Sequence, residues 1–224
     1  MTVPEAIPAA TVVLVRDLAD APGIEVLMLH RTSKGAFGGM WVFPGGRVDD
    51  EDRHPEDDGD EPAARRAAAR EAMEECGLSV DPDEIVLLSR WTPPPIAPKR
   101  FATWFFLARV PTGDVVVDGG EIVDHRWLAP LALLDQRDRG EIELAPPTWM
   151  TLNALLSARD VDDALARAAA VRPVIHYQTR WCTVDDGAVA MWEGDAGYDT
   201  SDVDVEGPRH RLWMLRSGWR FEQA

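Results

Sequence analysis

The segment of residues 63–76 constrains the fold most, because it contains six alanines and no glycine or proline. Pro62 suits the first turn of a helix, and Gly77 suits the left-handed residue that ends one. The sequence therefore predicts a helix over this segment. Glu71, Glu74 and Glu75 stand at positions i, i+3 and i+4, so a helix places their three carboxylates on one face.

Three carboxylates on one helix face need an explanation. Like charges at this spacing destabilise a helix by a few tenths of a kcal/mol per pair. A Mg²⁺ or Mn²⁺ ion prefers hard oxygen ligands and would turn the cluster into a metal site. Glutamate is also a good helix former, so the residues alone leave an acidic, solvent-facing helix as an equal alternative.

The rest of the chain interleaves strands and helices without a regular alternation, which predicts an α+β fold. A hairpin is expected first, and then a short strand that runs into the tight turn Pro44-Gly45-Gly46. Strands are expected at residues 11–16, 24–30, 41–43, 85–91, 102–109 and 122–127, helices after Pro130 and at 146–158 and 161–170, and hairpins at 174–193 and 212–221.

Acidic residues dominate the chain, which has a formal net charge of −16. Residues 48–62 contain nine carboxylates against the single Arg53, and we expect a solvated loop there. The charge excludes broad basic surfaces of the kind that hold nucleic acid or an anionic membrane. No apolar run approaches the roughly 18 residues of a spanning helix, so a cytoplasmic protein is expected.

The stretch from Arg70 to Leu78 resembles the second half of the Nudix box, Arg-Glu-U-x-Glu-Glu-x-Gly-U, where U is aliphatic. Ala72 is a small occupant of its U position. Phe43-Pro44-Gly45-Gly46 is similar to the sequence that leads into that box. The resemblance implies a Nudix-type α/β/α sandwich with a mixed sheet. It places the core over residues 1–145, with an acidic insertion at about 48–62, and a C-terminal helical and β-hairpin extension over 146–224 packed on the core.

The spacing departs from the family pattern, in which the opening glycine lies 14 positions before the arginine. Here Gly46 precedes Arg70 by 24 positions, so the intervening loop is enlarged by 10. The pattern also has a glutamate eight positions before the arginine. Glu61 lies nine positions before Arg70, and we leave it out of the site.

The resemblance implies that Glu71, Glu74 and Glu75 bind Mg²⁺ or Mn²⁺, with Glu71 or Glu74 also acting on the attacking water. The carbonyl of Gly45 is a further candidate ligand, and Arg70 is expected to orient a glutamate through a charged hydrogen bond. A later loop often supplies another carboxylate in this family. Glu121 is the first candidate for it and Asp124 the second, and an ordinary strand-edge role for Glu121 is equally compatible with the sequence.

The expected substrate is a nucleoside diphosphate derivative. The enlarged box resembles a Nudix subgroup that includes coenzyme A diphosphatases. The signature of coenzyme A is met only in part, because Arg31 fits it but Ala36 stands where arginine is expected. Lys99 and Arg100 form a basic pair that either meets a substrate phosphate or faces solvent. A Nudix-scaffold protein that binds a nucleotide without turnover is the alternative, and the extension either covers the pocket or forms a homodimer surface.

Overall fold

The computed structural model describes residues 5–33, 37–97 and 99–224. The chain forms two compact units. The first, here called the core unit, comprises residues 8–90 and 103–175. The second, the hairpin unit, comprises residues 91–102, 176–224 and the described part of 1–7. Across the described ranges, no helix is long and apolar enough to cross a membrane.

The core unit is built on a sheet with the strand order β3-β2-β1-β6-β5, to which β4 is added on β1 and β7 on β2. The first two strands form the expected antiparallel hairpin, with Val15 opposite Val26. The strands are β1 (Ile7–Asp17), β2 (Ile24–Arg31), β3 (Trp41–Val42), β4 (Gly45–Arg47), β5 (Val86–Thr92), β6 (Phe101–Arg109) and β7 (Ile122–Leu128).

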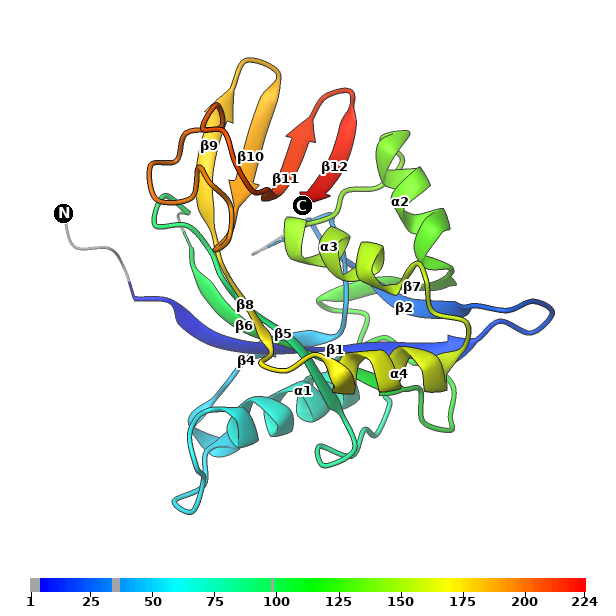
Figure 1. Ribbon diagram of the computed structural model, residues 1–224. Coiled ribbons are helices and arrows are strands. Elements are labelled where there is room, and N and C mark those ends of the chain that lie inside the picture. The colour runs from blue at the N-terminus through cyan, green and yellow to red at the C-terminus, as the bar shows by residue number, and fades with distance from the viewer. Residues whose placement is uncertain (1–4, 34–36, 98) are drawn as a thin grey trace. The chain divides into compact units, whose positions relative to one another are not determined.

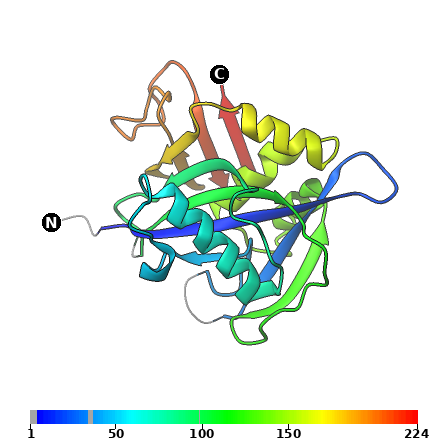
Figure 2. The ribbon, with the colours of Figure 1, turned by 90° about the horizontal axis from the view of Figure 1, so that it is seen from below.

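Helices cover this sheet on both faces, as an α/β/α sandwich requires. Helix α1 (Glu61–Cys76) lies on one face, and α2 (Pro130–Asp138) and α3 (Pro146–Leu155) lie on the other (Figure 1). In the view from below, α1 passes in front of β1 (Figure 2). Helix α4 (Val161–Ala170) completes the unit. The predicted α+β fold, with helices on both faces of a sheet, is confirmed.

Small side chains let α1 approach the sheet closely. Its Ala64, Ala67, Ala68 and Ala72 are fully buried in the main apolar cluster, which also includes β1 residues such as Leu14. The helix ends at Gly77, whose φ of 71° is left-handed, and the amide of Gly77 donates to the carbonyl of Met73. This packing fixes the height and rotation of the helix, and with them the face that carries the glutamates.

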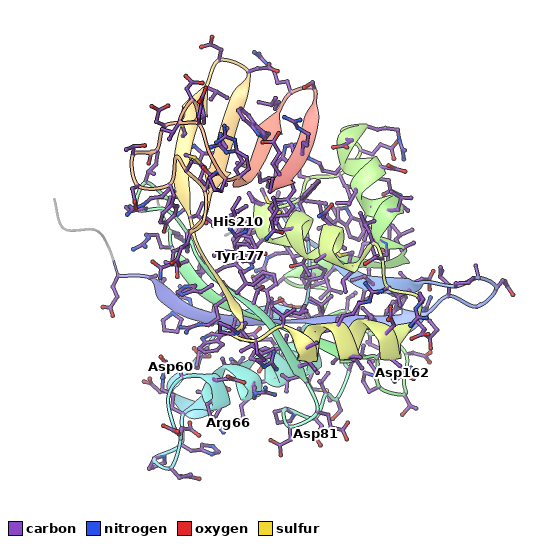
Figure 3. All side chains as sticks on the ribbon, in the orientation of Figure 1. Asp60, Arg66, Asp81, Asp162, Tyr177 and His210 are labelled. Carbon is purple, nitrogen blue, oxygen red and sulfur yellow. The ribbon has the colours of Figure 1, made fainter. Side chains whose placement is uncertain are left out.

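The prediction of a solvated loop for residues 48–62 is wrong in part. A 3₁₀ turn, η1 (Asp50–Asp52), interrupts the segment, and Asp52 is buried with 5% of its surface exposed. Arg66 of α1 pairs with Asp57, and Arg53 with Asp60 at 3.1 Å. Asp60 and Arg66 are labelled in Figure 3. Ion pairs with arginines of the helix hold the acidic segment against α1, so part of the insertion is ordered protein surface.

The hairpin unit contains a sheet with the order β12-β11-β10-β9, in which every neighbouring pair is antiparallel. Its strands are β9 (Arg180–Val184), β10 (Gly187–Met191), β11 (His210–Leu215) and β12 (Gly218–Gln223), and β8 (Ile175–Gln178) precedes them. Tyr177 stacks on Trp91 with ring centroids 4.1 Å apart, and it also contacts His210 (Figure 3). The expected C-terminal hairpins are present.

Candidate functional site

The three glutamates of α1 share one face but differ in exposure. The side chain of Glu75 is 6% exposed, that of Glu71 15% and that of Glu74 57%. The exposure of the three carboxylates therefore increases from Glu75, which is buried, to Glu74, which faces solvent. Burial raises the pKa of Glu71 above its ordinary value, because the charged form loses hydration there.

Glu75 is held by two donors from the sheet. Nη1 of Arg31, at the end of β2, lies 3.1 Å from Oε1, and the amide of Gly45 donates to Oε2 at 2.9 Å. Burial raises the pKa of Glu75 to about 7, although both donors favour the charged form. The innermost glutamate therefore sits between protonation states at neutral pH.

The glycines of β4 allow the backbone to pass directly beside the helix. A Cβ on Gly46 would lie 2.3 Å from Oε1 of Glu71, and one on Gly45 would lie 2.5 Å from the carbonyl oxygen of Ala10. Only glycine fits these contacts without displacement. The sequence predicts a tight turn at these residues. In the structure strand β4 begins there, and Gly45 pairs with Thr11 of β1.

Arg70 connects the glutamates to the insertion. Its Nη1 donates to Glu71 at 2.9 Å and to Glu74 at 3.2 Å, and its Nη2 donates to Asp52 at 3.0 Å. The hydrogen bond with Asp52 is the largest cause of a raised pKa for Arg70. A guanidinium fixed by a buried acid and aimed at two glutamates has the geometry that an orienting residue requires.

Asp52 contacts the candidate site through Arg70, and no sequence-based prediction includes it in the site. The family pattern puts its upstream acid eight positions before the arginine, which is six positions after the opening glycine. Six positions after Gly46 stands Asp52, whereas the position eight residues before Arg70 lies next to Glu61, because the enlarged loop separates the two counts. Glu61 instead pairs with Arg65 at 2.7 Å. The extra residues therefore lie between Asp52 and the helix.

Of the two loop carboxylates considered, Glu121 is the one near the helix glutamates. Its carboxylate pairs with Nη2 of Arg31, the same side chain that binds Glu75. Asp124 instead lines a polar cavity of about 300 Å³ with His30, Trp41, Arg126 and residues 140–143. None of the three helix glutamates is among the residues that line this cavity.

Three basic residues are expected to contact substrate, namely Arg31, Lys99 and Arg100. Lys99 and Arg100 belong to the hairpin unit, where Nη2 of Arg100 donates to the carbonyl of Pro93 at 3.1 Å. Arg31, expected to contact substrate, binds two carboxylates. Ala36 lies outside the described residues. Roles toward substrate for Arg31, Lys99 and Arg100 stay predictions.

The carboxylates have the donor chemistry that a divalent cation needs, but arginines occupy them. Among the residues that the structure describes, no group of three His, Cys, Asp or Glu side chains is arranged to hold a metal ion. Arg70 binds Glu71 and Glu74, while Arg31 binds Glu75 and Glu121. A Mg²⁺ or Mn²⁺ ion bound here would share these carboxylates with the arginines or displace the arginine contacts.

Comparison with known proteins places this arrangement in a family. A solved NUDIX hydrolase from Alicyclobacillus acidocaldarius is 26% identical, with 74% of this chain and 97% of that chain covered and a TM-score of 0.65. The NUDIX domain of Shewanella oneidensis NrtR complexed with ADP ribose is 19% identical (73% and 89% covered, TM-score 0.49). A C. elegans Ap4A hydrolase is 21% identical (66% and 93% covered, TM-score 0.47). No curated protein matches the chain.

The family model described as the NUDIX domain matches residues 6–148. This range contains the glycines of β4, the whole of α1 and the loop that carries Glu121. The motif recognised in the sequence and the three-dimensional site therefore coincide, and the chain belongs to the Nudix family.

Proposed function

We propose that the protein is a hydrolase that cleaves a diphosphate linkage in a nucleoside diphosphate derivative. The observation that carries this proposal is the position of Glu71, Glu74 and Glu75 on one face of α1, inside the matched Nudix domain. The similar structure from Alicyclobacillus acidocaldarius is also described as a NUDIX hydrolase.

Glu71, Glu74 and Glu75 are the proposed ligands of Mg²⁺ or Mn²⁺, together with the carbonyl of Gly45. When bound, the cation neutralises charge on the non-bridging oxygens of the diphosphate. Arg70 orients Glu71 and Glu74 through its two hydrogen bonds. Glu74 is the better candidate to take a proton from the attacking water, because its carboxylate is the most exposed of the three.

Coenzyme A and a dinucleotide are the first compounds to test, since the enlarged box resembles that of coenzyme A diphosphatases. Lys99 and Arg100 are the proposed phosphate contacts, whereas the guanidinium of Arg31 is held by Glu75 and Glu121. A protein with net charge −16 repels an anionic substrate, so local cations of this kind are needed.

The deciding experiment incubates the protein with each compound and Mg²⁺ or Mn²⁺, and identifies the products by mass spectrometry in ¹⁸O-labelled water. Turnover should require the metal and should fall by at least about 10³-fold in Glu74→Gln. Glu84→Gln is the matched control, because Glu84 is an exposed glutamate outside the site. Unchanged turnover in Glu74→Gln would contradict the assigned mechanism.

A nucleotide-binding or regulatory protein without turnover is the second candidate. The arginine contacts that occupy the glutamates favour it, because they satisfy the carboxylates without a metal ion. Calorimetry with the same compounds separates the candidates. Binding that persists in EDTA, with no product formed when the metal is restored, would support the binding protein.

A further inference from the structure

Arg31 joins carboxylates from two different elements. Its Nη1 binds Glu75 of α1 at 3.1 Å, and its Nη2 pairs with Glu121, which directly precedes β7. A guanidinium can do this because its donors form a rigid planar fork, whereas a lysine ammonium cannot fix two acceptors in one plane. Arg31 is thus a physical link between the helix and the loop of residues 118–121.

The inner half of this link is the rigid half. The side chains of Arg31 and Glu75 are 12% and 6% exposed, so the pair is shielded from water and salt. Nε of Arg31 is buried and has no hydrogen-bond partner within the described residues. Burial on this scale restricts the side chain of Arg31 more than the exposed side chain of Glu121.

The outer half of the link is the adjustable half. Glu121 is 55% exposed and could point into solvent, where an ion pair is worth little by itself. The loop behind it is held by exposed contacts, in which Asp118 accepts hydrogen bonds from the amides of Gly120, Glu121 and Ile122. The amide of Thr32 also donates to the carbonyl of Glu121 at 2.9 Å. Because Asp118 is itself exposed, we expect the ion pair with the buried Arg31 to set the direction of the Glu121 carboxylate and to add to the order of the loop.

An irregularity in the sheet brings the two residues together. Strand β2 pairs with β7 in regular register from Val26 to His30, and the register shifts between His30 and Arg31. Arg31 is therefore opposite Ile122, and Val123 is the extra residue. Bulges of this kind re-aim a side chain and are frequent beside active sites. The shift places Glu121 one residue beyond the partner of Arg31.

We propose that Arg31 is a positioning residue, which uses its fixed contact with Glu75 to hold the carboxylate of Glu121 at the helix glutamates. This role rests on the proposed hydrolase function, because it gives Glu121 a place in the reaction. It differs from simple neutralisation of Glu75, for which any cation at position 31 would serve.

The test compares Arg31→Gln, Arg31→Lys and Glu121→Gln with the parent. Hydrogen exchange of residues 118–122 is measured first, in metal-free protein without substrate. Arg31→Gln should raise exchange at these amides by about tenfold, and Arg31→Lys by nearly as much, because the ammonium cannot bridge both carboxylates. Arg126→Gln is the matched control, since Arg126 lies on β7, is half exposed and contacts only Asp124 among acidic partners in the described chain. It should leave exchange unchanged.

Turnover supplies the second readout. Arg31→Gln and Glu121→Gln should each lower kcat by about tenfold with little change in KM, and the double variant should fall no further than Glu121→Gln. Full restoration of protection and kcat by Arg31→Lys would overturn the proposal, and so would additive losses in the double variant. If Arg31→Gln does not fold, Glu121→Gln removes the same ion pair from its exposed side and must still raise exchange.

The two proposals fail in different ways. Raised exchange in a protein that hydrolyses none of the diphosphates would refute the hydrolase function and support the link. Metal-dependent hydrolysis with unchanged exchange in both Arg31→Gln and Glu121→Gln would refute the link alone.

Discussion

Replacing Gly46 by alanine tests whether Glu71 must stand where α1 places it. The new Cβ would lie 2.3 Å from Oε1 and 2.4 Å from Cδ of Glu71, whereas ordinary contact begins near 3.4 Å. The carboxylate must therefore retreat by about 1 Å, and a displacement of that size in a catalytic group costs about 10²-fold in rate. Because the obstacle is the end of a flexible side chain, the fold should lose less than about 1 kcal/mol.

The assay measures kcat and urea unfolding of Gly46→Ala beside those of Gly45→Ala. In the second variant the new Cβ meets backbone, 2.5 Å from the oxygen of Ala10 and 2.7 Å from Cα of Thr11. Backbone in a sheet cannot yield easily, so Gly45→Ala should lose about 2 kcal/mol of stability or more. Neighbouring glycines thus report on function and on folding separately. Turnover of Gly46→Ala within threefold of the parent would refute the role of Glu71.

Three further predictions concern charges. Asp52→Ala should lower the free energy of unfolding by about 2 kcal/mol in urea titrations, because it leaves Arg70 without its buried partner, and an unchanged midpoint would contradict this. The raised pKa of Glu75, about 7, means that metal-free protein should lose stability as pH rises from 4.5 through 7. Glu75→Gln should reduce that slope in melting curves and leave the part due to Glu71, whose pKa burial also raises. Burial alone would raise the pKa of Asp195, but Arg211 and two backbone amides lower that pKa to about 2. The stability that the Asp195–Arg211 pair gives should therefore be lost only as pH falls from about 4 toward 2. Asp195→Asn should lower the free energy of unfolding by about 3 kcal/mol at neutral pH.

Local signals were sufficient for much of the fold. The alanine-rich segment between Pro62 and Gly77 has one strong preference, and its helix ends at the predicted residue Cys76. The first hairpin follows from two β-branched runs around a turn ending in Gly23. The structure of the insertion was harder to predict. A run of carboxylates suggests a solvated loop when the arginines that pair with it are distant in the sequence. The buried Asp52 pairs with Arg70, which lies 18 positions away in the sequence.

The residue types of the site were predictable from the sequence, but the ion pairs that connect those residues were not. The spacing of Glu71, Glu74 and Glu75 fixes their common face, since helical periodicity alone decides it. The link between Glu75 and Glu121 depends on Arg31, whose direction depends on a shifted register between β2 and β7. No local pattern encodes a shift of that kind. Partners from β2, η1 and the loop before β7 meet at α1 only through tertiary packing.

The repulsion among three glutamates on one helix face led us to expect a cation there, and the structure contains two of its own. Arg70 lies between Glu71 and Glu74, and Arg31 lies between Glu75 and Glu121. These contacts offset the repulsion within the carboxylate cluster, so its charge pattern by itself does not require a metal. Membership of the Nudix family is what favours Mg²⁺ or Mn²⁺. Both arginines are tied to buried acids, so they hold the carboxylates in fixed positions. If Arg70 orients Glu71 and Glu74 as ligands, isothermal titration should show weaker Mn²⁺ binding by Arg70→Gln than by the parent. Tighter binding would mean that the positive charge of the arginine opposes the ion more than the side chain orders the ligands.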